Sequence, residues 1–263
     1  MRVKISVLMT VFNAEKFIFD SIKSILSQSF KEFELIIVDD CSIDKTYSIV
    51  KSFSDKRIRI FKVDKRLGRT KALNYGLKKC SANVISIQDA DDISNYKRLE
   101  ENFKILNSNK NIGLVCSNHE LIDENGIELK KKFQISSEKK ILSAIKYINL
   151  VSHSSVSFRK NYFNKQKEFF YDENFIYAQD YDLILKFLKD SNIYFIPKNL
   201  VKIRHHKENM SNSKIYKKIR IIEYIKLLNF SEKNIKNNLK EYSLIKYFKF
   251  KNYFKLFLNL LGV

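Results

Sequence analysis

Short polar side chains follow three of the first four predicted strands, at the points where those strands end. They are Asn13, Asp39, Asp40, Asp89, Asp91 and Asp92. Because ligands of an open parallel sheet bind at the carboxyl ends of its strands, we expect the five carboxylates to converge on one rim. Crowded carboxylates need a compensating cation or hydrogen-bond donors, and Mg²⁺ or Mn²⁺ bound to a diphosphate is the natural partner. The alternative is that these aspartates only cap turns and helices, as we expect for Asp44.

Two common phosphate-binding motifs are missing from the sequence. No G-x-G-x-x-G segment follows the first strand, and no Walker loop occurs anywhere. A dinucleotide oxidoreductase or a P-loop enzyme therefore has no support. A phosphate-receiver domain would place its acidic pair after the first strand, whereas this pair follows the second.

Strands and helices alternate five times in the first part of the chain. The hydrophobic pattern predicts strands over 3–11, 33–38, 58–63, 83–88 and 112–117, and helices over 15–29, 44–53, 71–79 and 97–106. This order is typical of an α/β fold with a mostly parallel sheet and helices on both faces. We expect residues 1–118 to form the nucleotide-binding half of such a domain.

The alternation ends after residue 118. Asp-Glu-Asn-Gly at 123–126 predicts a hairpin turn, 155–158 a strand, and 180–189 a helix that begins with Asp180. Residues 193–203 predict two short strands around the single proline, Pro197. The chain then becomes helical from Ser213 onward. We expect 119–211 to be the acceptor-binding half, 1–211 to form one catalytic domain, and 212–263 to be a basic amphipathic helical tail.

Several segments together resemble glycosyltransferase family 2, which has the Rossmann-like GT-A fold. The matching segments are 6–15, 27–30, 36–46 and 68–76, the Gln-Asp-Ala-Asp-Asp element at 88–92, Ala-Gln-Asp-Tyr-Asp-Leu at 178–183, and Arg204-His205-His206 with Ser211. The resemblance covers residues 3–211. It implies an inverting bacterial enzyme that transfers a sugar from a nucleoside diphosphate, here expected to be a UDP-sugar.

The resemblance also implies roles for individual positions. The residues that would bind the nucleotide-sugar are Val11, Asn13, Glu15, Asp39, Asp40, Lys71, Asp89, Ala90, Asp91 and Arg204. Asp180 would be the catalytic base, which takes the proton of the acceptor hydroxyl. Asp91 and His206 would hold the divalent metal, Mn²⁺ or Mg²⁺, with Asp89 and Asp92 as further possible ligands. Asp180 alone could instead be read as a helix cap.

Some positions depart from the family pattern or have no clear role. Gln179 stands where many relatives have Glu, and Phe12 where Tyr is common, which leaves the donor undetermined. His153 is expected to be structural rather than catalytic. Arg69 and Lys71 begin a helix after Gly68, where either could touch a diphosphate or simply face solvent.

Basic residues exceed acidic ones by 20, which at first suggests a polyanionic partner. The chain holds 40 Lys and only 9 Arg, whereas specific phosphate or base recognition relies on Arg. We therefore expect no nucleic-acid partner. A basic nucleic-acid-binding protein and an inactive partner subunit of a glycosyltransferase are the alternatives. The retained Asp89, Asp91 and Asp180 argue against the second.

Residues 212–263 carry 12 Lys and Arg against 3 acids, and they interleave these with aromatic residues. Such a helix can lie on an anionic membrane, or it can fold back on the catalytic domain. The three cysteines have no disulfide-like spacing, which favours a reducing compartment. We expect a cytoplasmic enzyme, peripheral on the inner face of the membrane, that extends a surface glycan or lipid-linked glycan.

Overall fold

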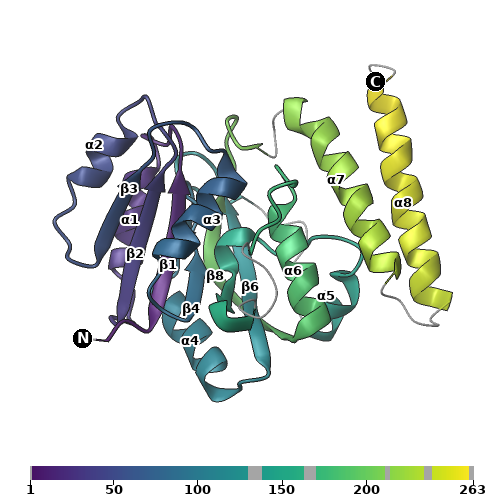
Figure 1. Ribbon diagram of the computed structural model, residues 1–263, viewed down its shortest axis with the longest axis horizontal. Helices are drawn as coiled ribbons and strands as arrows, with labels where there is room; N and C mark the ends of the chain where they lie inside the picture. Colours follow the sequence, from purple (N-terminus) through teal and green to yellow (C-terminus); the bar gives the residue numbers. More distant parts are fainter. Residues whose placement is uncertain (1, 130–137, 163–169, 211–213, 234–238, 261–263) are drawn as a thin grey trace.

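The computed structural model describes residues 2–129, 138–162, 170–210, 214–233 and 239–260. These form an eight-stranded sheet in the order β3-β2-β1-β4-β7-β6-β8-β5, with helices on both of its faces (Figure 1). The strands are β1 (Ile5–Val11), β2 (Phe33–Asp39), β3 (Ile58–Lys62), β4 (Val84–Ile87), β5 (Ile93–Ser94), β6 (Ile112–Ile122), β7 (Ser157–Arg159) and β8 (Asn192–Arg204). The helices are α1 (Ile18–Leu26), α2 (Thr46–Lys51), α3 (Arg69–Lys79), α4 (Arg98–Ser108), α5 (Glu138–Ala144), α6 (Gln179–Asp190), α7 (Lys214–Lys233) and α8 (Leu239–Leu260).

The first four long strands confirm the predicted α/β alternation. β1 lies between β2 and β4 and is parallel to both, while β3 is parallel to β2. Residues along β1 point alternately to two separate cores, so that Leu8 packs with α3 and Val7 with α1. Both faces are buried, which is why the strand sequences are almost continuously apolar. The register pairs Val11 with Asp39, so the loops after β1 and β2 begin side by side.

The second half of the sheet mixes parallel and antiparallel strands. Strand β7 inserts antiparallel between β4 and β6, so these two consecutive long strands are not neighbours. The predicted pair of strands over 193–203 is wrong: β8 is one long strand parallel to β6. The register shifts between Ser117 and Asn118, opposite Pro197. This irregularity lets the strand accommodate a residue that has no N–H for the ladder.

The sequence did not predict the short strand β5 or the short helix α5. Strand β5 has only two residues and pairs antiparallel with β8, and α5 follows the segment 130–137, which lies outside the described residues. A two-residue strand is too short to produce a hydrophobic period. Its place at the sheet edge nevertheless brings the end of β8 next to residues 91–92.

The C-terminal helices lie side by side at the end of the molecule away from β3 (Figure 1). Helix α7 packs on α6, where Leu227 joins a buried cluster with Phe175, Tyr181 and Leu185. Of the two arrangements left open by the sequence, α7 thus adopts the folded-back one. None of the helices in the described residues is long and apolar enough to cross a membrane.

Candidate active site

The loops after β1 and β2 are tied together by hydrogen bonds. Asn13 has a left-handed backbone (φ 50°), and its side-chain oxygen accepts from the Ile43 N–H at 3.0 Å. The Glu15 carboxylate accepts from the Lys45 N–H at 2.9 Å. These two predicted nucleotide-binding side chains therefore shape the rim. Val11 is buried, and its carbonyl accepts from the Asp40 N–H at 2.8 Å.

The two carboxylates after β2 have different environments. Asp40 accepts from the N–H groups of Leu67 and Gly68, at 2.6 and 2.9 Å, and so fixes the loop that leads into α3. Asp39 is completely buried and accepts from the Ser42 N–H with one oxygen only. Its other oxygen, Oδ2, has no hydrogen-bond partner among the described residues. A buried carboxylate oxygen without a donor is costly unless a ligand supplies one.

The carboxylate of Asp89 lies against two basic side chains. Arg69 donates to its Oδ1 at 2.6 Å, and the same oxygen lies 3.6 Å from Nδ1 of His153. Burial acts to raise the pKa of Asp89, but Arg69 and His153 outweigh it and hold this pKa well below the usual range. Nε2 of His153 lies 2.9 Å from the hydroxyl of the buried Tyr171. His153 is thus buried, as expected, but it is part of the site.

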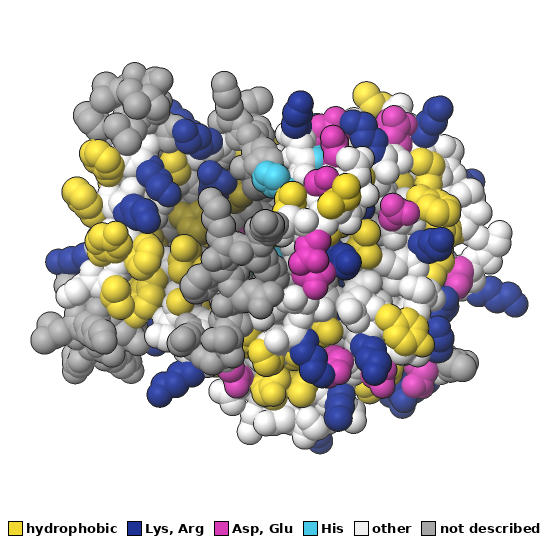
Figure 2. Space-filling model, turned by 180° about the vertical axis from the view of Figure 1, so that it is seen from behind, with side chains coloured by type: hydrophobic (Ala, Val, Ile, Leu, Met, Phe, Trp, Pro, Cys, Tyr) yellow, Lys and Arg dark blue, Asp and Glu magenta, His cyan; other side chains and the backbone are white. Residues whose placement is uncertain are grey.

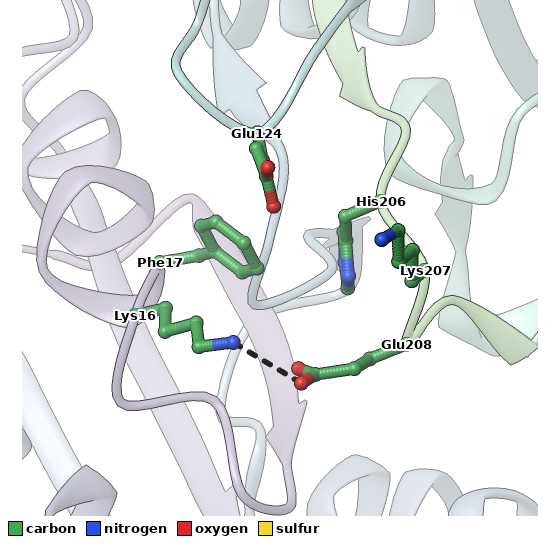
Figure 3. A pocket seen from close by; sticks show the side chains of 6 residues that line it. All are labelled: Lys16, Phe17, Glu124, His206, Lys207 and Glu208. Carbon is green, nitrogen blue, oxygen red and sulfur yellow. Dashed lines mark hydrogen bonds and ion pairs between the residues drawn. The ribbon is translucent and has the colours of Figure 1, made fainter.

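Asp91 faces a different group of side chains. Its Oδ2 lies 3.0 Å from Nε2 of His206 and accepts from Nδ2 of Asn209 at 3.0 Å. The His206 ring packs on Phe17, with ring centroids 4.6 Å apart. His206 and Phe17 line a small pocket together with Lys16, Glu124, Lys207 and Glu208 (Figure 3). The predicted Asp91–His206 pair is therefore brought together at the edge of an opening.

Arg204 is buried behind this pair. Its Nε donates to the Asp91 carbonyl at 3.0 Å, and its Nη1 donates to the carbonyls of Asp123 and Glu124. The guanidinium lies 4.9 Å from the centroid of the Phe17 ring. With these donors directed at backbone oxygens, Arg204 holds the 123–126 turn against the Asp91 loop rather than facing the opening.

Asp92 is buried, with both carboxyl oxygens in hydrogen bonds. Oδ2 accepts from the Ser154 hydroxyl, and Oδ1 accepts from the Arg204 N–H at 3.0 Å. Burial, followed by the negative charges of Asp91 and Asp89, raises its pKa well above the usual range. The Asp92 carboxyl thus ties the loop after β4 to the end of β8. Of Asp91 and Asp92, Asp91 is the more exposed residue.

Asp180 stands in the first turn of α6 and is distant in sequence from the other carboxylates. One oxygen accepts from the Tyr181 N–H at 2.7 Å and the other from Nδ2 of Asn149 at 3.0 Å. Burial raises its pKa, against the lowering effect of His153. The side-chain amide of the neighbouring Gln179 is oriented so that its NH₂ group donates to the carbonyls of Ile176 and Tyr177. Its oxygen then accepts from Nε of Arg69 at 3.0 Å.

Arg69 therefore lies among three of the predicted site carboxylates. Burial acts to lower its pKa, but Asp89, Asp91 and Asp180 raise it, in that order, and the net pKa is above the ordinary value. The sequence placed Arg69 only as a possible diphosphate contact. In the structure it joins the start of α3 to the end of β4 and the start of α6.

A carboxylate from the C-terminal part of the chain supports the segment just before α6. Glu223 of α7 is buried, and it accepts from the N–H groups of Ile176, Tyr177 and Ala178 at 2.7, 2.9 and 2.8 Å. Asp180 follows two residues later. This contact was missed because Glu223 lies outside every recognised motif. The only signal was a lone acid inside the basic, apolar stretch 214–228.

The remaining predicted positions are less engaged. Lys71 is exposed on α3, Ala90 is buried in the 89–92 loop, and Ser211 lies outside the described residues. No cluster of three or more His, Cys, Asp or Glu side chains suited to a metal occurs in the part of the chain that the structure describes. The Asp91–His206 pair still offers a carboxylate oxygen and an imidazole nitrogen 3.0 Å apart. This donor set fits a divalent ion that takes its other ligands from a diphosphate.

Comparisons with known proteins show the family of this chain. Residues 6–175 match the family model of glycosyl transferase family 2. The Escherichia coli UDP-Glc:alpha-D-GlcNAc-diphosphoundecaprenol beta-1,3-glucosyltransferase WfgD is 32% identical over 189 residues, which cover 72% of this chain and 71% of that protein. Other curated relatives extend further, and this chain spans 66% of their length.

Solved structures show the same fold. Staphylococcus aureus TarS 1–349 in complex with UDP-GlcNAc superposes with a TM-score of 0.71 at 20% identity, covering 94% of this chain and 70% of that one. The mannosyltransferase PcManGT from Pyrobaculum calidifontis, in complex with GDP-Man and Mn²⁺, gives a TM-score of 0.70 at 16% identity and covers 97% of this chain and 72% of that one.

Proposed function

Because this chain belongs to glycosyltransferase family 2, we propose that it transfers a sugar from a nucleoside-diphosphate donor of the UDP-sugar class to a hydroxyl of a growing bacterial surface glycan, with inversion at the transferred carbon. The observation that carries the proposal is that Arg69 donates both to Asp89, at the end of β4, and to Gln179, the residue before Asp180. It supports a single site in which the donor-side carboxylates and the base act in one transfer reaction. The UDP-GlcNAc complex of TarS and the UDP-Glc named for WfgD support a uridine donor.

The nucleotide would bind at the rim formed by the loops after β1 and β2. Asp39 has an unused buried acceptor there, which suits an N–H or hydroxyl of the base or ribose. Asn13, Glu15 and Asp40 keep the rim rigid through their backbone hydrogen bonds. A rigid rim reduces the ordering cost of binding a flexible nucleotide.

Asp91 and His206 would hold a divalent ion, Mn²⁺ or Mg²⁺, next to the donor diphosphate. When bound, such an ion offsets the charge that develops on the leaving diphosphate. Asn209 donates to the same Asp91 oxygen and so orients the carboxylate. The contacts of Arg204 to the Asp91 carbonyl and the 123–124 turn keep that loop in place.

Asp180 would act as the base. As the acceptor oxygen attacks the sugar carbon, the bond from that carbon to the diphosphate oxygen breaks, and Asp180 takes the hydroxyl proton. Its raised pKa makes it a better proton acceptor than an exposed aspartate, provided that it is ionised at the working pH. Asn149 fixes the carboxylate by donating to one oxygen.

We further propose that residues 1–118 bind the donor and residues 119–211 the acceptor. The acceptor would be a glycan or a lipid-linked glycan, by analogy with the GlcNAc-diphosphoundecaprenol in the name of WfgD. The loops that would select it lie around 119–175, where the described residues contribute Asn149, His153 and Tyr171 to the site.

A thermal-shift panel of UDP- and GDP-sugars with Mn²⁺ or Mg²⁺ tests the proposal, because a ligand that binds the folded state raises the melting temperature. We expect a nucleotide sugar to stabilise the protein in a metal-dependent way, and the same donor to release its nucleoside diphosphate when a glycan acceptor is added. Asp180→Asn should keep donor stabilisation and lose turnover by about 10²–10⁴-fold. Full turnover in this variant would move the base elsewhere.

A further inference from the structure

Helix α8 presents an aromatic face that nothing in the described residues covers. Four large rings on this helix have more than half of their surface exposed: Tyr247, Phe250, Tyr253 and Phe254, at 58, 69, 51 and 53%. An α-helix turns 100° per residue, which places these four within one sector of its surface. Exposed apolar patches of this kind mark interaction sites. We call these four residues the α8 aromatic face.

The opposite side of α8 is held against the rest of the molecule. Ile245 is buried, Phe248 stacks on Tyr147 with ring centroids 6.1 Å apart, and Lys249 pairs with Glu232 of α7 at 2.6 Å. Residues 245, 248 and 249 follow helical spacing, so they fix the rotation of the helix. The aromatic face is therefore directed outward by the packing of the helix.

Positive charge borders the aromatic face on both sides. Lys246 lies just inside the edge formed by Tyr253, and Lys251 and Lys255 lie beyond the edge formed by Tyr247; all three are exposed. The segment 243–255 contains no Asp or Glu. Figure 2 shows hydrophobic and basic side chains intermingled over this end of the molecule. Aromatic rings flanked by lysines suit a lipid interface, where rings enter the headgroup region and lysines reach the phosphates.

We infer that the α8 aromatic face docks the protein onto an anionic lipid surface. A second copy of the chain fits less well, because pairing two such faces would bring lysine against lysine. A nucleic acid fits less well because the face is convex and contains no Arg, whereas single-strand binders use grooves and cation–π stacking by Arg. The inference rests on α8 alone and stands whether or not the proposed sugar transfer is correct.

Flotation of the full-length protein with vesicles tests the inference. Vesicles of phosphatidylcholine alone are compared with vesicles that also contain phosphatidylglycerol. We expect binding to the anionic vesicles, weakened by added salt. Phe250→Ser with Phe254→Ser should reduce partitioning on the order of tenfold or more. Replacing Lys246, Lys251 and Lys255 with Gln should reduce it on the order of a hundredfold, at about fivefold for each lysine.

Matched controls come from the first 110 residues of the chain. Phe19 and Tyr96 are exposed aromatic residues, at 49 and 57%, and their double Ser variant should bind anionic vesicles like the wild type. A triple Gln variant of the exposed Lys56, Lys65 and Lys110 should lose far less binding than the α8 triple variant. Circular dichroism and the melting temperature confirm that each variant is folded.

Four outcomes would overturn the inference. One is that the folded wild type does not float with the anionic vesicles, and another is that the α8 variants bind as well as their controls. The third is a dimer in light scattering that Phe250→Ser with Phe254→Ser converts to a monomer, which would assign the face to a second copy. A single-stranded oligonucleotide that binds as tightly as the vesicles, and is lost in the same variants, would assign it to nucleic acid.

Discussion

Replacing Glu223 with Gln tests whether α7 supports the segment that carries Asp180. The wild-type carboxylate accepts three backbone N–H groups, one through Oε1 and two through Oε2. A Gln side chain has the same shape but only one oxygen. Its NH₂ group must face at least one of the three N–H donors, and it brings no negative charge to the region before α6.

The cost follows from counting these bonds. In the better orientation of the amide, the two N–H groups of Tyr177 and Ala178 keep an acceptor, but a neutral one in place of a charged one, at about 1 kcal/mol each. The N–H of Ile176 loses its acceptor and faces another donor, which costs about 1 kcal/mol more. The sum is about 3 kcal/mol of unfolding free energy, or roughly 6–10 °C in melting temperature for a domain of this size.

Urea denaturation and turnover measurements together test the reasoning. Loosening the turn before Asp180 should lower kcat by about tenfold or more and leave the KM for the donor nearly unchanged, because small displacements of a reacting group are costly. The matched control is Glu232→Gln, also in α7, whose pair with Lys249 is near the surface and contributes about 0–1 kcal/mol. If Glu223→Gln were as stable and as active as Glu232→Gln, the proposed support of Asp180 by α7 would be refuted.

Three further predictions concern the site itself. Because burial raises the pKa of Asp180, the rate of transfer should fall on the acid side of the pH–rate profile at a higher pH than an exposed aspartate would give. Asn149→Ala removes a hydrogen bond that lowers this pKa, so the acid limb of the profile should move to a still higher pH. Measured pH–rate profiles of both proteins check these shifts. Asp91→Ala should abolish the metal-dependent stabilisation by the donor in thermal shift, and EDTA should have the same effect on the wild type. Arg69→Gln should cost about 1–3 kcal/mol at neutral pH in urea denaturation, and the deficit should shrink as pH falls through the acid range, because the Arg69 contact stabilises only the ionised form of Asp89.

The first half of the fold was predictable largely because β1, β2 and β4 are buried on both faces. Strands β1, β2 and β4 read as apolar runs separated by helical periods, and the predicted bounds agree with the structure to within a few residues. The second half depends on contacts between residues far apart in the chain. The insertion of β7 between β4 and β6, and the continuity of β8 through Pro197, follow from pairing that no local pattern records.

The site was predictable in its carboxylates and not in the groups that control them. Asp89, Asp91 and Asp180 are recognisable from the family resemblance, whereas Arg69, which donates to Asp89 and to Gln179 beside Asp180, was placed only as a possible diphosphate contact. His153 looked isolated because its partners, Arg69 and Tyr171, are 84 and 18 residues away in sequence. The signal for Asn209 was equally weak, since an Asn three residues after a His is common in any loop.

Three carboxylates within four residues acquire different properties because each meets a different neighbour. Arg69 and His153 keep Asp89 ionised, and the Arg69 guanidinium supplies the positive charge that a metal ion would otherwise have to supply. Asp92 is enclosed with Ser154 and the Arg204 N–H, where burial favours the neutral form. Asp91 is partly exposed and lies 3.0 Å from a second metal-binding group, Nε2 of His206, which lines the pocket. The same short motif can therefore offer one carboxylate to a ligand without the mutual repulsion that three free carboxylates would suffer.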